Sequence, residues 1–291
     1  MKKLLKKIYH IIPFKKQLFT FLKIFWQPSE KVYRHLSFHG VINVNTDKDH
    51  SFKIMHYGFQ IENEIFWDGL AEGWEKESFK LWIKLSRTSE VIFDIGANTG
   101  VYSLISKSLN PQAKVYAFEP VKRVYQKLVA NAELNNYDIV SIDKAVSSYD
   151  GEATFFDSKE EHIYSVTINL EQRENDLRTE LTKTEVIKLD TFIEQEKLTK
   201  VDLVKMDVET HEPEALEGFQ FYLNKFRPTI LIEILTTDVA ERVSNLVKDL
   251  DYIYFNIDEA KGIRRVEQIS QSDDFNFLLC SKEKAVELGL A

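Results

Sequence analysis

The chain has 291 residues, 44% of them hydrophobic and 29% charged, a composition that is ordinary for a globular protein and excludes a fibrous or globally disordered one. Residues 1–26 hold seven lysines and no acid, which leaves 31 basic and 46 acidic residues elsewhere; such an acidic body argues against a nucleic-acid partner, whose binding needs clustered Lys and Arg. The single cysteine, Cys280, excludes an intramolecular disulfide and a cysteine-based zinc cluster, and it suits a reducing compartment.

The first 26 residues interleave their lysines with apolar side chains. Lys15 and Lys16 interrupt the apolar stretch, so it is too broken for a signal peptide or a membrane span. Two interpretations stay open. The segment is either a helix pair docked on the main domain, or a basic and aromatic arm in peripheral contact with an anionic membrane. We therefore expect a cytoplasmic protein, with the inner face of the membrane as a second location.

Residues 38–66 are predicted to form three short strands, over 38–44, 51–57 and 59–66, in a small antiparallel element. Residues 74–85 place apolar side chains near helical spacing and predict an amphipathic helix. Residues 1–88 are thus expected to be a basic arm and a small β/helical extension, ahead of a main domain over 89–291.

From residue 91 onward, predicted strands and helices alternate with short connections. The strands are expected over 91–95, 114–119, 139–147, 201–209 and 228–234, with 252–257 and 275–280 closing the sheet, and the helices over 101–109, 121–134 and 213–223. This alternation predicts an α/β, Rossmann-like fold with a mostly parallel, doubly wound sheet. A small β insertion is expected over about 151–190, with strands at GEATFF, YSVTI and EVIKLDTF and a polar, mobile stretch over 169–183.

The run Asp94-Ile-Gly96-Ala97-Asn98-Thr-Gly100 follows the first strand of this domain and opens a helix. Glycines there allow a tight turn and bring the backbone close to a ligand at the helix N-terminus. A dinucleotide site has the form G-x-G-x-x-G, whose second glycine makes room for the pyrophosphate. Here Asn98 takes that position and Gly100 closes the spacing one residue early. The run therefore favours S-adenosylmethionine, which has no phosphates and whose positive charges Asp94 would attract, over a nicotinamide cofactor.

Glu119 ends the next strand, nineteen residues after Gly100. An acidic side chain at this place can accept hydrogen bonds from both ribose hydroxyls. Pro120 beside it and Ala145 in the following strand are predicted to complete the donor site. A simple strand-end carboxylate is the alternative interpretation of Glu119 taken alone.

A third group of polar residues follows the strand over 201–209. Asp207, Glu209 and His211 alternate there, and Glu233 lies at the end of the next strand. Ligands of open α/β sheets bind at the carboxyl ends of strands near the switch point, so we expect these side chains to converge on the methyl group. Helix capping and solvation are the alternative explanation of this polar run.

The stretches FDIGANTG, FEP, LDTFIEQEKLTKVDLVKMDVETHEPEALEGF and RPTILIEI resemble the FkbM family of methyltransferases over roughly residues 90–235. This resemblance implies a class I methyltransferase fold, S-adenosylmethionine as donor, and O-methylation, often of sugars or polyketide-type products. The family usually has glycine where this chain has Thr210. A β-branched residue is strained there if the loop needs a positive φ.

We therefore expect an S-adenosylmethionine-dependent O-methyltransferase that acts on a hydroxyl of a sugar or glycan intermediate. Another small natural product as acceptor, or a non-catalytic methyltransferase-like binding or adapter protein, are the alternatives. The hydroxyl proton must leave as the methyl arrives. Asp207, Glu209 or His211 is expected to take it as a general base, or else Mg²⁺ held by Asp207 and Glu233 acidifies the hydroxyl; both mechanisms stay open.

Overall fold

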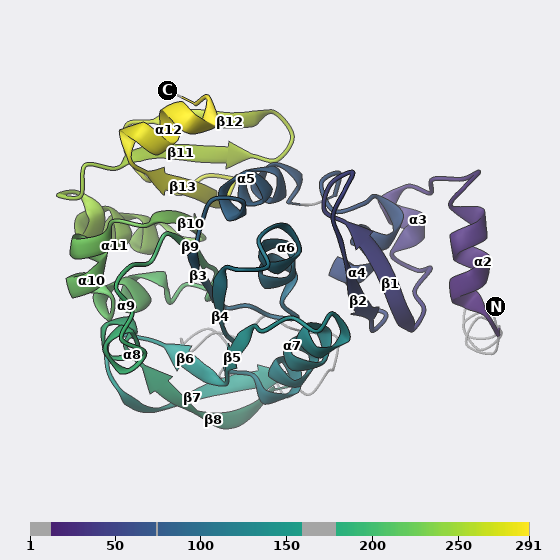
Figure 1. Ribbon diagram of the computed structural model, residues 1–291, viewed down its shortest axis with the longest axis horizontal. Coiled ribbons are helices and arrows are strands. Elements are labelled where there is room, and N and C mark those ends of the chain that lie inside the picture. Colours follow the sequence, from purple (N-terminus) through teal and green to yellow (C-terminus); the bar gives the residue numbers. More distant parts are fainter. Residues whose placement is uncertain (1–12, 74, 159–178, 291) are drawn as a thin grey trace.

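The structure is a computed structural model, and it describes residues 13–73, 75–158 and 179–290. At its centre lies an eight-stranded sheet with the strand order β12-β11-β13-β10-β9-β3-β4-β5 (Figure 1). The strands of this sheet are β3 (Val91–Ile95), β4 (Lys114–Phe118), β5 (Val140–Ile142), β9 (Leu203–Met206), β10 (Thr229–Glu233), β11 (Ile253–Asp258), β12 (Gly262–Val266) and β13 (Asn276–Cys280).

Five neighbouring strands of the sheet, from β5 to β10, run parallel. Strand β13 runs antiparallel between β10 and β11, and β12 pairs antiparallel with β11. The chain passes outward from β3 to β4 and β5 and then returns to β9, on the other side of β3, which places the topological switch point between β3 and β9. This order confirms the predicted Rossmann-like, doubly wound α/β fold.

Helices cover both faces of the sheet (Figure 1). They are α5 (Lys76–Ser86), α6 (Val101–Leu109), α7 (Lys122–Leu134), α8 (Leu189–Gln195), α9 (Glu212–Glu217), α10 (Gln220–Phe226), α11 (Thr237–Val247) and α12 (Lys282–Leu288). Strand β3 shows why two layers form, because successive side chains of a strand point to opposite faces. Ile92 packs in one core cluster with Trp82 and Leu104, whereas Phe93 packs in another with Phe192 and Phe219.

An N-terminal extension precedes the sheet. Its elements are α2 (Lys15–Leu22), α3 (Glu30–Tyr33), β1 (Gly40–Asn45), β2 (Ser51–His56) and α4 (Gln60–Trp67). Strands β1 and β2 form the predicted antiparallel pair. Phe19 of α2, Ile54 of β2 and Ile92 of β3 belong to one hydrophobic core cluster, so the extension and the sheet share a core. Within the described ranges, every helix is too short or too polar to cross a bilayer.

The third strand predicted for the extension is wrong, because residues 59–66 lie mostly in helix α4. Ile61 and Ile65 fit an alternating strand pattern, but they are also four residues apart and therefore share one face of a helix. The side chain of Gln60 donates a hydrogen bond to Glu64 at 2.9 Å, one helical turn further on. A pattern of four apolar positions does not separate these two periods.

The single strand predicted over 139–147 is also wrong, because it is two short strands in two different sheets. Strand β5 pairs with β4 in the main sheet, whereas β6 (Lys144–Val146) pairs with β8 (Thr179–Ile187). With β7 (Gly151–Ser158), these strands form a three-stranded sheet of order β6-β8-β7. Ala145 therefore lies in the small sheet, beside the end of β4.

Other predicted boundaries shift in similar ways. The strands at GEATFF and at the start of EVIKLDTF are confirmed as β7 and β8, whereas Leu189 already begins helix α8. The helix predicted over 213–223 is divided into α9 and α10 around Gly218, where a Cβ would overlap the carbonyl oxygen of Ser147. The strand expected at YSVTI and most of the expected polar stretch lie outside the described residues.

Candidate active site

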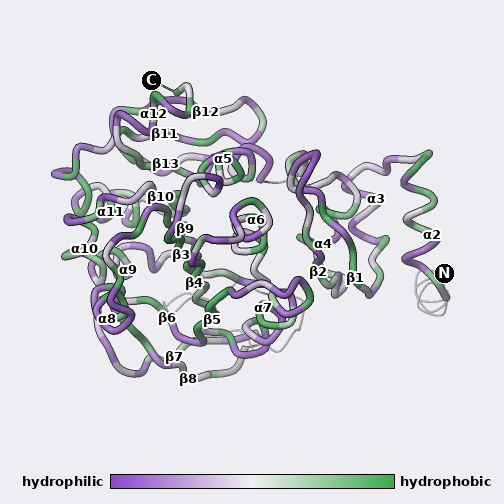
Figure 2. The backbone as a smooth tube through the Cα atoms, viewed as in Figure 1, coloured by the Kyte–Doolittle hydropathy of each residue, from purple (hydrophilic) through white to green (hydrophobic). Residues whose placement is uncertain are grey.

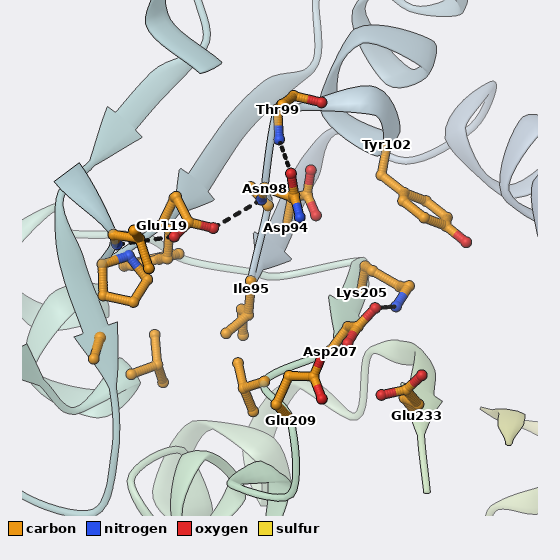
Figure 3. Close-up of a pocket in the computed structure, with 18 of the residues that line it drawn as sticks. Asp94, Ile95, Asn98, Thr99, Tyr102, Glu119, Lys205, Asp207, Glu209 and Glu233 are labelled. Carbon is orange, nitrogen blue, oxygen red and sulfur yellow. Dashed lines mark hydrogen bonds and ion pairs between the residues drawn. The ribbon is translucent and has the colours of Figure 1, made fainter. Parts of the chain in front are cut away.

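A cavity of about 230 Å³ lies at the carboxyl ends of β3, β4, β9 and β10, at the switch point of the sheet (Figure 3). The loop after β3, the residues after β4, strand β6, the loop after β9 and the end of β10 supply its walls. Open α/β sheets place their ligands here, because the loops diverge on either side of the switch point.

The loop after β3 is fixed to its neighbours by backbone contacts. The N–H groups of Gly96 and Ala97 donate to the carbonyl of Phe118, at 3.0 and 2.9 Å. Gly96 has a φ of +77°, and a Cβ on it would overlap the carbonyl oxygen of Asp207. Glycine is therefore needed here both for the turn and for the close approach of the β9 strand end.

Glu119 is buried at the end of β4 and holds the same loop through its carboxylate. One oxygen accepts from the N–H of Asn98 at 3.0 Å and the other from the N–H of Val121 at 2.9 Å. Burial raises the pKa of Glu119 to about 7, and these two hydrogen bonds oppose that rise. A carboxylate has about four acceptor positions, so two remain for the hydroxyls of a ribose.

Asp94 lines the cavity, but it also fixes the start of helix α6. Its Oδ2 atom accepts from the backbone N–H and from the hydroxyl of Ser103, at 3.0 and 2.6 Å. Burial raises the pKa of Asp94 to about 6. Gly100, with a φ of +90°, was predicted to contact the donor, but it is not among the residues that line the cavity. A Cβ on it would overlap the side chain of Leu128, so its role is to let α6 and α7 pack closely.

Two buried hydroxyls in the cavity wall have no hydrogen-bond partner among the described residues. They are Oγ1 of Thr99 and Oη of Tyr102. Buried polar atoms without partners are rare in folded proteins, because each costs free energy. Both oxygens are inaccessible from the cavity, however, so the fit to S-adenosylmethionine rests on the free acceptor positions of the Glu119 carboxylate.

The opposite side of the cavity carries a buried ion pair. The ammonium of Lys205, on β9, lies 3.1 Å from Oδ2 of Asp207, and it lies 5.1 Å from the ring centre of Tyr102. Burial lowers the pKa of Lys205, but the negative charges of Asp207, Glu75 and Glu233 outweigh it, so the net shift is upward. Lys205 is therefore a permanent cation inside the cavity wall.

Glu233 and Glu209 lie beside this ion pair (Figure 3). Burial raises the pKa of Glu233, and the neighbouring charge of Asp207 raises it further. Glu209 and Thr210 have φ values of +54° and +74°. The loop thus takes the left-handed conformation that makes a threonine strained, at a cost of about 1–2 kcal/mol.

His211 lies in the cavity wall with both ring nitrogens near protein groups. Its Nε2 is 2.9 Å from the hydroxyl of Ser147, and its Nδ1 is 3.5 Å from a carboxylate oxygen of Glu214. Burial lowers the pKa of His211, which favours the neutral ring. The structure therefore brings His211 to the cavity, but its ring is already engaged by residues outside the predicted site.

The family model of the methyltransferase FkbM domain matches residues 94–254. The chain belongs to the FkbM methyltransferase family. The predicted family, the enzyme class and S-adenosylmethionine as methyl donor are thereby confirmed. The match covers every wall of the cavity except the residues that precede Asp94.

Individual relatives of this FkbM methyltransferase differ in how much of them aligns. It is 24% identical over 201 residues to the hexuronic acid methyltransferase AglP of Haloferax volcanii, which covers 69% of this chain and 75% of that protein. It is 28% identical over 155 residues to methyltransferase sdnD of Sordaria araneosa, which covers 44% of this chain and 59% of that protein. A crystal structure of methyltransferase FkbM from Methylobacillus flagellatus aligns with 17% identity and a TM-score of 0.41, over 66% of this chain and 43% of that one.

The cavity of this FkbM methyltransferase contains most of the predicted site. The predicted residues that line it are Asp94, Gly96, Ala97, Asn98, Glu119, Pro120, Ala145, Asp207, Glu209, His211 and Glu233. Lys205, Tyr102, Thr99 and Glu75 line it as well and were missed. For Lys205 a signal existed, because a lysine inside an apolar strand and two residues before Asp207 lies on the same face as that aspartate.

Replacing Glu119 with alanine is expected to weaken the binding of S-adenosylmethionine and S-adenosylhomocysteine about 10- to 100-fold. Hydrogen bonds to a charged group contribute about 1.5–3 kcal/mol, and 1.4 kcal/mol is a factor of ten. Calorimetric titration measures both affinities, with Glu133→Ala on the exposed face of α7 as the matched control. Unchanged affinity in Glu119→Ala would remove Glu119 from the donor site, and tight NADH binding without S-adenosylmethionine binding would refute the site as a whole.

Proposed function

We propose that this FkbM methyltransferase transfers a methyl group to a hydroxyl of a sugar or glycan intermediate, with Asp207 as the general base. One observation carries the proposal. Asp207 is partly exposed in the cavity at the end of β9, and the buried ammonium of Lys205 lies against it. A relative named a hexuronic acid methyltransferase supports a sugar as the acceptor.

The expected chemistry is an in-line displacement. S-adenosylmethionine, when bound, supplies a methyl group on a positively charged sulfur. As the acceptor oxygen bonds to this carbon and the carbon–sulfur bond breaks, the hydroxyl proton passes to a carboxylate oxygen of Asp207. The ammonium of Lys205 holds the carboxylate of Asp207 in place, and the walls of the cavity align the acceptor with the methyl group.

Asp207 is a better base than His211 in this geometry. The two ring nitrogens of His211 face Ser147 and Glu214. Asp207 contacts the ammonium of Lys205 at 3.1 Å and shares a hydrogen bond with Glu233, and its carboxylate still has acceptor positions left that face the cavity. A proton acceptor needs a free lone pair that is directed at the hydroxyl. We therefore assign His211 to holding the loop after β9 against Ser147, which precedes β7.

Mg²⁺ held by Asp207 and Glu233 is the other mechanism that the residues allow. An ammonium already neutralises Asp207, and a divalent cation beside it would be repelled by Lys205. Within the described ranges, the acidic and histidine side chains form no group of three that is arranged to hold a metal ion. We therefore favour the general base.

The charges that line the cavity limit which kinds of acceptor fit it. Four carboxyl groups, those of Glu75, Asp207, Glu209 and Glu233, lie on or near the side that carries Lys205. Both lysines among the described lining residues are already ion-paired, Lys205 with Asp207 and Lys144 with Glu185. A carboxylate of the acceptor would find no free cation in these walls. We propose that the part of the acceptor that enters the cavity is an uncharged, hydroxylated ring.

Transfer of labelled methyl groups to a panel of acceptors tests this function. We expect turnover with neutral hexosides and at least about tenfold less with the matching hexuronates, because one unfavourable charge contact of about 1.4 kcal/mol is a factor of ten. Preference for phenolic or polyketide hydroxyls would favour a natural-product acceptor instead. Donor binding without transfer to any acceptor of the panel would favour the non-catalytic adapter.

A further inference from the structure

Helix α2 has two apolar faces, and only one of them is covered by the protein. Phe19 is buried, with its ring centre 6.1 Å from that of Phe38 and 5.6 Å from that of Trp67. Trp26, just after the helix, lies 6.1 Å from the same Trp67 ring. Lys23 adds a hydrogen bond from its ammonium to the carbonyl of Phe66. These contacts fix α2 to the extension with a defined orientation.

The opposite face of this helix consists of large apolar side chains in solvent. Phe14, Leu18, Phe21 and Phe25 are spaced by four, three and four residues, which places them on one side of the helix and of the turn that follows it. Their exposed fractions are 74%, 42%, 59% and 74%, and that of the neighbouring Ile24 is 70%. We name these five residues the α2 patch.

The α2 patch is unusual for this molecule. Of the twelve large apolar residues that are exposed within the described ranges, seven lie between residues 14 and 32, and the other five are scattered over the rest of the chain. Single exposed apolar side chains are normal, but a contiguous patch of this size marks an interaction surface. Figure 2 shows hydrophobic stretches along α2, which lies at one end of the molecule, beyond β1 and the main sheet.

The charge around the patch indicates its partner. Residues 1–26 carry seven lysines and no acid, whereas the remaining residues have a net charge of −15. A second copy docked through the same face would bring two sets of these lysines together. An anionic lipid surface instead offers negative headgroups to the lysines and an apolar interior to the aromatic side chains.

We propose that the α2 patch inserts into the headgroup region of an anionic membrane, which attracts the lysine-rich, acid-free sequence of residues 1–26. The buried Phe19 and the contact of Trp26 with Trp67 hold the helix against the extension, so the whole enzyme is attached through a fixed surface. This attachment does not depend on which acceptor is methylated.

Co-sedimentation with vesicles of phosphatidylcholine, with and without phosphatidylglycerol, tests the proposal on the full chain. The double variant Phe21→Ser/Phe25→Ser is compared with Phe221→Ser, which alters a 62% exposed phenylalanine on α10. We expect the double variant to lower binding to the anionic vesicles by at least about tenfold, since it removes two large apolar anchors, and we expect Phe221→Ser to bind like the wild type. Binding should weaken as salt screens the lysines, over about 10 Å at 0.1 M.

Each other outcome overturns the proposal. Equal sedimentation of the wild type and the double variant would show that the patch does not contact lipid. Equal binding to neutral and anionic vesicles would show that the lysines do not contribute, and would contradict the proposed anionic surface. A wild-type dimer that the double variant converts to a monomer, seen by analytical ultracentrifugation without vesicles, would assign the patch to a second copy. Donor affinity, measured in parallel by calorimetry, should be the same in all variants, which separates this test from that of the methyl transfer.

Discussion

Replacing Asp207 with asparagine is expected to lower turnover by about 10²-fold or more, the loss that follows removal of a general base. Asparagine keeps the shape of the side chain and can still contact Lys205, but it cannot accept the hydroxyl proton. Affinity for S-adenosylmethionine should persist, because Glu119 and the loop after β3 lie on other strand ends. Steady-state turnover is measured with an acceptor that the wild type methylates. Calorimetric titration measures the affinity for the donor separately.

Three further measurements on the same enzyme identify the mechanism. With Asp207 as the base, His211→Ala should be milder than Asp207→Asn, and a chelator should leave turnover unchanged. With Mg²⁺ in the site, the chelator should stop turnover and Glu233→Gln should resemble Asp207→Asn. Activity of Asp207→Asn near that of the wild type would refute the assignment of this strand end to catalysis.

Replacing Lys205 with methionine should reduce both stability and turnover. The buried carboxyl groups around Lys205 would lose their counter-charge, so the free energy of unfolding should fall by about 3 kcal/mol. This value is at the lower end of the range for a broken buried ion pair, because Asp207 is partly exposed. The pKa of Lys205 is raised in the folded protein, so its stabilising contribution is complete below about pH 10 and is lost only above that. In the variant the carboxyl groups can take up protons instead, so the stability deficit should shrink as the pH falls.

Urea unfolding of the wild type and Lys205→Met at several pH values measures this deficit. Lys144→Met is the matched control, because Lys144 also lines the cavity but forms its ion pair with Glu185, which is largely exposed. Its effect on stability should be below about 1 kcal/mol. Turnover of Lys205→Met should fall as well, since no ammonium then holds the carboxylate of Asp207 in place. Equal stability and equal turnover would show that the ion pair has no such role.

The regular part of the fold could be predicted from local patterns. Buried runs such as those of β3 and β10 are short and continuous, and the helices between them carry one apolar face, so their alternation indicates a parallel sheet. The turn at Gly96 and the carboxylate of Glu119 stand at fixed places relative to two of these strands. Both were therefore located from spacing alone, and both line the cavity.

The parts that could not be predicted depend on contacts between distant segments. Residues 139–147 form two strands because the second of them pairs with β8, about forty residues later, and no local signal marks that change. His211 was expected to face the methyl group, but its ring meets Ser147, 64 residues away in sequence. The proximity of Lys205 to Asp207 could have been read from their spacing, but Glu233 approaches Lys205 only because β10 pairs with β9.

The contact between Gly96 and the carbonyl of Asp207 fixes two sides of the cavity relative to each other. It joins the loop after β3 to the strand end that bears Asp207 through main-chain atoms alone, with no room for a single methyl group between them. The separation between this loop and the end of β9 is therefore set by the backbone and not by side chains. Ile61 and Glu75, the two described lining residues that precede β3, can therefore be replaced to suit another acceptor without changing this separation.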